Sequence, residues 1–306
     1  MKNTFMVAAI MVLAVACHRA TVPAGTTVTN TPIINTEIKN ASGQTILAGR
    51  ASISAMQMPN YKTWYDDSYN SYAVDVAAAR QLQPLLQNKT MEVFLGSWCG
   101  DSKREVPRMI RILQQAGMDT ARLSLVFVDN STGSYKQSPQ HEERGKSIHH
   151  VPTFIIYDDK KEIGRIVESP VSSLEKDLLA ILQQQSYQPN YRAINHWTKQ
   201  VIERNRNMTD SELQNLVATL KPLCRHYGEF NGYGYVLLAA RNTTEALNVF
   251  RLNTMIYPDN AGVFDSLAEA WETTGNKKEA IAAYEKVLQL KPGDEKAKGR
   301  VASLKM

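Results

Sequence analysis

The sequence predicts an α/β domain followed by an all-α domain. Short apolar runs of strand length alternate with segments of helical periodicity between residues 91 and 182. After residue 185 the strand signals stop, and apolar residues recur only at helical spacing. The chain has 306 residues, which is enough for two domains, and we place these at 51–185 and 186–306.

The first 17 residues predict export. Lys2 precedes an unbroken apolar run over 5–16, which is too short to cross a bilayer as a helix. The run ends in Ala14-Val15-Ala16-Cys17, which resembles the lipobox of bacterial lipoproteins. That resemblance implies a signal peptide over 1–17 and a lipid on Cys17. An ordinary signal-peptidase cut that leaves Cys17 unmodified is the alternative.

Either cleavage exports the protein. We expect a lipid-anchored form in the bacterial cell envelope, held at the outer membrane and facing the periplasm, because His18 rather than an Asp follows Cys17. The formal net charge is +5, and no basic cluster interleaved with aromatic residues stands out, so we expect no nucleic-acid partner. If Cys17 carries lipid, only Cys99 and Cys224 remain as thiols, too few for a disulfide framework.

Residues 18–50 predict a flexible tether because they are rich in Thr, Pro, Asn and Gly, with one short strand expected over 45–54. Five aromatic residues then recur at helical spacing, so we expect them to pack on one helix face: Tyr61, Trp64, Tyr65, Tyr69 and Tyr72. A platform for a sugar or a peptide is the alternative. Residues 74–87 predict a further helix, interrupted near Pro84.

A lone cysteine, Cys99, lies where a predicted strand ends and a predicted helix begins. The apolar run 91–95 reads as a buried strand, and the residues after Cys99 place Val106, Met109, Ile110 and Leu113 on one helical face. A thiolate at this position faces the positive end of the helix dipole and several free backbone N–H groups, which favours a reactive cysteine. A buried structural cysteine is the alternative.

Further elements follow the cysteine in the order strand, hairpin, helix. Residues 123–128 predict a buried strand, and a polar loop over 130–146 follows. A hairpin is expected over 154–167, with its turn at 158–161, and a final helix runs to Leu182. The strand–helix–strand unit supplies parallel pairing, and the hairpin supplies antiparallel pairing.

Two motifs in this region resemble the thioredoxin superfamily. Trp98-Cys99-Gly100 with Pro107 matches the start of that family's first long helix, and Val151-Pro152-Thr153 matches its cis-proline loop. The resemblance covers about 91–182 and implies a thioredoxin-like fold with a cis peptide before Pro152. It also implies catalytic roles for Cys99, Trp98, Ser102 and Pro152, and substrate contacts from Gly100, Val151 and Thr153.

The sequence departs from that family at two positions. Ser102 replaces the second cysteine, and Val93 stands where many members have a buried Asp, with Glu92 expected on the other strand face. We expect a monothiol protein that forms mixed disulfides with exported proteins carrying thiols or disulfides, and a Ser102 hydroxyl bonded to Cys99 Sγ. A thiol-disulfide oxidoreductase or isomerase of monothiol type would work in this way.

Two alternatives stay open. One is a redox-inactive scaffold for protein–protein interaction, and the other is a redox cycle in which Cys224 resolves the Cys99 adduct. Asp101 stands in the first helical turn, where it complements the helix dipole. His149 and His150 are expected as loop residues near the site; we expect no metal and no cofactor.

The carboxyl-terminal part carries a 34-residue repeat. Ala246 and Ala280, Phe250 and Tyr284, and Pro258 and Pro292 are each 34 positions apart. This spacing resembles tetratricopeptide (TPR) repeats over about 230–297, which implies paired helices and, as one of two open readings, a groove for a peptide ligand. The other reading is that the repeats only pack on the first domain.

The helices before the repeat are expected to cap the stack. Thr209 and Glu212 have the spacing of a capping box, and Pro222 is expected to bend the helix that follows them. Cys224, near the end of that helix, reads as a buried, inert cysteine.

Overall fold

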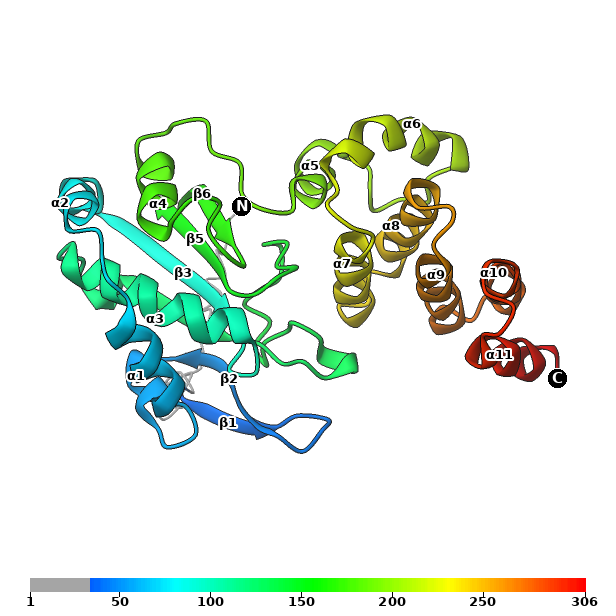
Figure 1. Cartoon of the computed structure of the whole chain (residues 1–306), viewed down its shortest axis with the longest axis horizontal. Coiled ribbons are helices and arrows are strands. Elements are labelled where there is room, and N and C mark those ends of the chain that lie inside the picture. The colour runs from blue at the N-terminus through cyan, green and yellow to red at the C-terminus, as the bar shows by residue number, and fades with distance from the viewer. Residues whose placement is uncertain (1–33) are drawn as a thin grey trace, which may run out of the picture. The chain divides into compact units, whose positions relative to one another are not determined.

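The computed structural model describes residues 34–306. The predictions about the signal peptide and the lipid on Cys17 lie outside the described residues. Figure 1 shows a mixed sheet with helices in the first half of the chain and helices alone in the second. This confirms the predicted α/β domain followed by an all-α domain. Below, the α/β half is residues 34–185 and the helical half is residues 186–306.

Six strands form one mixed sheet in the order β1-β2-β4-β3-β5-β6. The strands are β1 Thr36–Lys39, β2 Thr45–Ala51, β3 Lys89–Leu95, β4 Leu123–Phe127, β5 Thr153–Asp158 and β6 Lys161–Val167. Only the β3–β4 pair is parallel, with Val93 opposite Leu125. The helix between these two strands supplies the crossover that a parallel pair needs.

The strand expected over 45–54 is present as β2, whereas the tether prediction is wrong at Thr36–Lys39, where β1 lies. Ile46 and Leu47 of β2 are fully buried, and Gly49 pairs with Phe127 of β4. β1 lies at the edge of the sheet and alternates half-buried and exposed side chains, so its composition stays polar. The partner strand β4 is far away in sequence, and local composition does not reveal such pairing.

Helices pack on the sheet through an apolar core. They are α1 Lys62–Ser71, α2 Val76–Leu85, α3 Gly100–Gln115 and α4 Leu174–Leu182, with short 3-10 segments at Ile53–Gln57, Thr120–Arg122 and Thr132–Ser134. The predicted apolar face of α3 is confirmed, because all four of its residues are buried: Val106, Met109, Ile110 and Leu113. Tyr61 and Tyr65 are buried in the same core, so the aromatic segment packs as expected.

A second, smaller apolar cluster lies on the other face of the sheet. Phe94 points there because it alternates along β3 with Val93 and Leu95, which belong to the larger core. Its other members come from β4, β5 and the loop before β5: Val126, Val128, Ile148, Val151 and Ile155. Trp98 and Cys99 pack against this cluster, so it forms the floor of the predicted thiol site.

The helical half contains seven α-helices. They are α5 Arg192–Gln200, α6 Asp210–Leu220, α7 Gly228–Ala239, α8 Thr243–Ile256, α9 Ala261–Thr273, α10 Lys277–Leu290 and α11 Glu295–Lys305. The capping box of Thr209 and Glu212 is confirmed. α6 ends at Leu220 rather than bending, because Pro222 lies in a separate 3-10 turn, Lys221–Leu223.

The 34-residue spacing places equivalent residues in the helical core. Ala246, Ala280, Phe250 and Tyr284 are all fully buried. A Cβ atom on Gly234 of α7 would lie only 2.5 Å from the Phe250 ring of α8, so glycine permits this close helix approach. In the described part of the chain, no helix is both long and apolar enough to span a membrane.

Candidate functional site

Cys99 is the N-cap residue of α3. β3 ends at Leu95, and a tight turn follows in which the Cys99 N–H donates to Gly96 O at 2.9 Å. The first helical bond runs from Lys103 N to Cys99 O at 3.0 Å. The thiol is partly exposed and lies at the end of the helix where backbone N–H groups are free, as the sequence predicts.

The Trp98 ring is fixed beside the cysteine. Its Nε1–H donates to Val128 O at 2.8 Å, at the end of β4. The ring lies so close to Gly96 that a Cβ atom there would meet it at 2.5 Å. Gly96 therefore leaves room for the indole, and the indole packs against the apolar cluster that forms the floor of the site.

The peptide bond between Val151 and Pro152 is cis, as predicted. The Cys99 Sγ–H donates to Val151 O at 3.2 Å, so the two predicted motifs meet in space although 52 positions separate them. Pro152 and the side chains of Val151 and Thr153 are buried. A contact of Val151 or Thr153 with a substrate would therefore involve backbone atoms, while Gly100 is exposed beside the thiol.

Ser102 does not bond to Cys99, contrary to our expectation. Its side chain is 1% exposed, and its Oγ accepts a hydrogen bond from Gly96 N at 3.2 Å. Ser102 lies within α3, where its side chain turns inward to the amide that follows β3. Cys99, as the N-cap residue, points instead to the cis-proline loop.

Two acidic residues at the start of α3 share one arginine as their partner. Asp101 Oδ1 accepts from Arg104 at 2.5 Å, and Arg104 also bonds to the buried Glu105 at 2.6 Å. Glu92 lies on the opposite strand face from Val93, as expected, where its carboxylate accepts from Lys146 Nζ at 2.6 Å. The Glu92 carboxylate is thus paired with a lysine of a neighbouring loop.

His149 and His150 form a pair beside the cis-proline loop, in which His149 is fully buried and His150 is largely covered. Their Nδ1 atoms are 2.7 Å apart, so one ring donates and the other accepts. Burial, with Lys136 and Arg165 nearby, lowers the pKa of His149 to about 3. Burial also lowers the pKa of His150 far below its usual value. Both rings are therefore neutral near pH 7 and support the loop through packing.

Three residues that hold this loop were not singled out in the sequence. Lys136 Nζ donates to His149 O at 2.7 Å, and Glu168 N donates to Pro152 O at 2.7 Å. The Tyr191 ring stacks on His150 with centroids 3.7 Å apart. Glu168 and Tyr191 both have left-handed backbone conformations, which side-chain chemistry does not reveal at these positions.

Cys224 is partly buried at the end of the 3-10 turn after α6. Its Sγ–H donates to Leu220 O at 3.3 Å, and burial raises the pKa of the thiol to about 12. A thiol in this state is a poor nucleophile near neutral pH. Within residues 34–306, no group of three or more His, Cys, Asp or Glu side chains is arranged to hold a metal ion.

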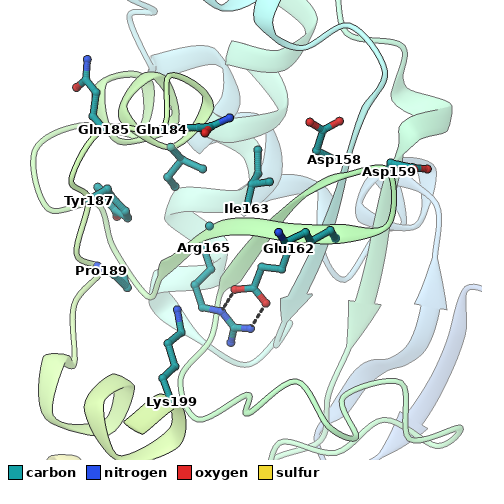
Figure 2. A pocket seen from close by; sticks show the side chains of 13 residues that line it. Asp158, Asp159, Glu162, Ile163, Arg165, Gln184, Gln185, Tyr187, Pro189 and Lys199 are labelled. Atoms are coloured by element: carbon teal, nitrogen blue, oxygen red, sulfur yellow. Dashed lines mark hydrogen bonds and ion pairs between the residues drawn. The ribbon is translucent and has the colours of Figure 1, made fainter.

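A pocket of about 800 Å³ lies along β6, away from the thiol (Figure 2). It is open and polar, and Arg165 forms a bidentate ion pair with Glu162 on its wall. Asp158, at its rim, pairs with Lys89 at 2.9 Å. Lys161, Tyr187 and Lys199 also line this pocket, and Cys99 is not among its lining residues.

Searches with this sequence found no matching protein-family model and no matching curated protein.

Proposed function

We propose that this protein forms mixed disulfides with partner proteins through Cys99, on a thioredoxin-like domain that carries TPR-like helices. The observation that supports this best is the pairing of Cys99 Sγ with Val151 O beside the cis Val151–Pro152 bond. The chain order β3, α3, β4, β5, β6 and α4 also supports it, because it follows the expected order strand, helix, strand, hairpin, helix.

The proposed reaction is a thiol–disulfide exchange. The partly exposed Cys99 thiol gives its proton to solvent, and the thiolate attacks one sulfur of a partner's disulfide. A new bond forms between Cys99 Sγ and that sulfur, the old S–S bond breaks, and the partner's second sulfur leaves as a thiolate. Val151 O then loses its hydrogen-bond donor and can accept an N–H from the partner backbone.

The adduct should be long-lived. Ser102 offers a buried hydroxyl instead of a second thiol, and Cys224 is kept protonated by its burial. A separate thiol must therefore attack Cys99 Sγ or the partner sulfur to release the partner. An exported, lipid-anchored protein would meet substrates of this kind, namely exported proteins with thiols or disulfides. Mass spectrometry of the mature amino terminus tests the lipid on Cys17.

The test is adduct formation by the full-length protein. Incubation with oxidised glutathione should add one glutathione to the peptide that contains Cys99, and peptide mapping by mass spectrometry locates it. Cys99→Ser should abolish this adduct, whereas Cys224→Ser, the matched control, should leave it unchanged. An adduct on Cys224 alone, or no adduct on either residue, would contradict the proposal.

A scaffold without redox activity is the second candidate. It is favoured by one observation, the burial of the cis-proline loop between the Cys99 motif and residues of the helical half. A scaffold would bind its partner equally well after Cys99→Ala. A mixed-disulfide protein would lose partner capture with the same substitution.

A further inference from the structure

Four consecutive backbone carbonyls of the cis-proline loop each have a hydrogen-bond donor. His149 O accepts from Lys136 Nζ, His150 O from Thr153 Oγ1, and Pro152 O from Glu168 N, each at 2.7 Å. The donor to Val151 O is the Cys99 thiol, at 3.2 Å. Any change in the path of this loop therefore changes the surroundings of the thiol.

The helical half contributes an aromatic platform to this loop. Tyr191, the N-cap residue of α5, places its ring nearly parallel to His150, with centroids 3.7 Å apart and planes at 15°. The same ring meets His149 edge-on at 5.6 Å, and Tyr233 of α7 meets His149 at 6.0 Å. His150 immediately precedes Val151, so the stack packs against the residue next to the Val151 carbonyl.

Tyr191 is itself held rigidly. It is 8% exposed, and its backbone has φ of 65°, a left-handed conformation that packing must maintain. Its hydroxyl donates to the carboxylate of Glu168, the residue whose N–H holds Pro152 O. Asn190, the residue before it, donates to Ser169 O at 2.8 Å and accepts from Arg225 at 2.6 Å.

We propose that Tyr191 is a positioning residue of the thiol site: its ring holds His150, and through it the Val151 carbonyl to which Cys99 donates. The inference rests on the proposed chemistry at Cys99. It makes the helical half part of the site, because Tyr191 is the N-cap residue of α5, which packs into the helical core.

The test compares the rate at which iodoacetamide alkylates Cys99 in full-length variants between pH 6 and 10, read on the Cys99 peptide by mass spectrometry. Tyr191→Ala removes the platform. Because a hydrogen bond donated by a thiol favours its protonated form, alkylation should become about three- to tenfold faster at pH 7, and its pH profile should move to lower pH. Tyr191→Phe keeps the ring and should restore the wild-type profile.

Tyr235→Ala is the matched control, because Tyr235 packs on Phe250 and donates to Glu269 within the helical half. It should leave the profile unchanged. If Tyr191→Ala does not fold, His150→Ala removes the same stack from the other side and should shift the profile equally.

A wild-type Cys99 that reacts, with a profile that neither Tyr191→Ala nor His150→Ala changes, overturns the inference and leaves the proposed function intact. A Cys99 that is inert in wild type and becomes reactive in Tyr191→Ala supports the positioning role but contradicts the proposed function. A Cys99 that is inert in every variant overturns both.

Discussion

At the scale of single residues, Cys99 and Ser102 lie one helical turn apart and serve different parts of the structure. Cys99 Sγ donates outward to Val151 O, while Ser102 Oγ accepts inward from Gly96 N. A side chain at position 102 that cannot accept this bond leaves the Gly96 amide without a partner, which costs about 1–3 kcal/mol. Position 102 thus affects both the chemistry of the site and the stability of the fold.

Ser102→Cys should convert a persistent adduct into a transient one. The thiol introduced at position 102 attacks Cys99 Sγ within the molecule, so the partner is released and an internal disulfide forms between Cys99 and the introduced residue. Intramolecular attack should shorten the adduct half-life at least about tenfold without added thiol. The measurement is the half-life of a Cys99 adduct with a disulfide-containing peptide, followed by mass spectrometry.

Ser102→Ala is the matched control for this change. It removes the same acceptor from Gly96 N, and a thiol is itself only a weak acceptor, so both variants should lose similar stability. The adduct of Ser102→Ala should persist as in wild type. Equal adduct half-lives in the alanine and cysteine variants would show that a thiol at position 102 cannot reach Cys99 Sγ.

At the scale of elements, the helical half depends on close helix pairs. α7 approaches α8 where Gly234 faces the Phe250 ring, and Phe250 has its 34-residue counterpart in Tyr284. Gly232 lies two positions earlier on α7, and a Cβ atom there would have no heavy atom within 4 Å. Two glycines of one helix thus differ in what an added methyl group would contact.

Gly234→Ala should lower the free energy of unfolding by about 1–3 kcal/mol, the usual cost of overpacking a core. Gly232→Ala should instead be neutral or stabilising by up to about 1 kcal/mol, because alanine is the better helix former. Urea unfolding followed by circular dichroism measures both. Equal effects of the two substitutions would contradict the close approach of α7 to Phe250.

Local patterns in the sequence predicted those features that local interactions determine. The apolar face of α3 and the capping box at Thr209 follow from spacing alone, and both are present. The resemblance also located the Cys99 and Val151–Pro152 motifs, which do meet. The predicted hydrogen bond between the Ser102 hydroxyl and Cys99 Sγ was wrong. The sequence does not show which way a side chain turns at a strand–helix junction.

At the scale of the whole molecule, sequence patterns did not predict the contacts between segments that are far apart in the chain. β1 and β2 gain their stability by joining β4, and Tyr191 reaches back to His150 across 41 positions of chain. Residues 34–306 lie within one compact unit, so the two halves are packed together. His149 and His150 are neutral and covered where the two halves meet. The association of the two halves should therefore be sensitive to acid.

Stability should fall as the pH drops below about 6.5, the pKa of a histidine in the unfolded chain. Burial is the main cause of the lowered pKa of both rings in the folded protein. Lys136 and Arg165 add to it for His149, and His149, Lys136 and His226 add to it for His150. The unfolded state therefore binds protons first, so the stability that each neutral ring contributes is fully present above pH 6.5. It is lost as the pH falls toward 3 for His149, and at still lower pH for His150. The loss is about 1.4 kcal/mol per pH unit for each ring.

Urea unfolding of wild type and His149→Phe at pH 7.5 and pH 5.0 measures this dependence. His149→Phe removes one titrating ring but keeps an aromatic side chain against Tyr191 and Tyr233, so its stability should fall less between the two pH values. The difference between the two proteins should be about 1–2 kcal/mol. An equal loss in both proteins would mean that His149 is already solvated in the folded state and that the two halves do not bury it.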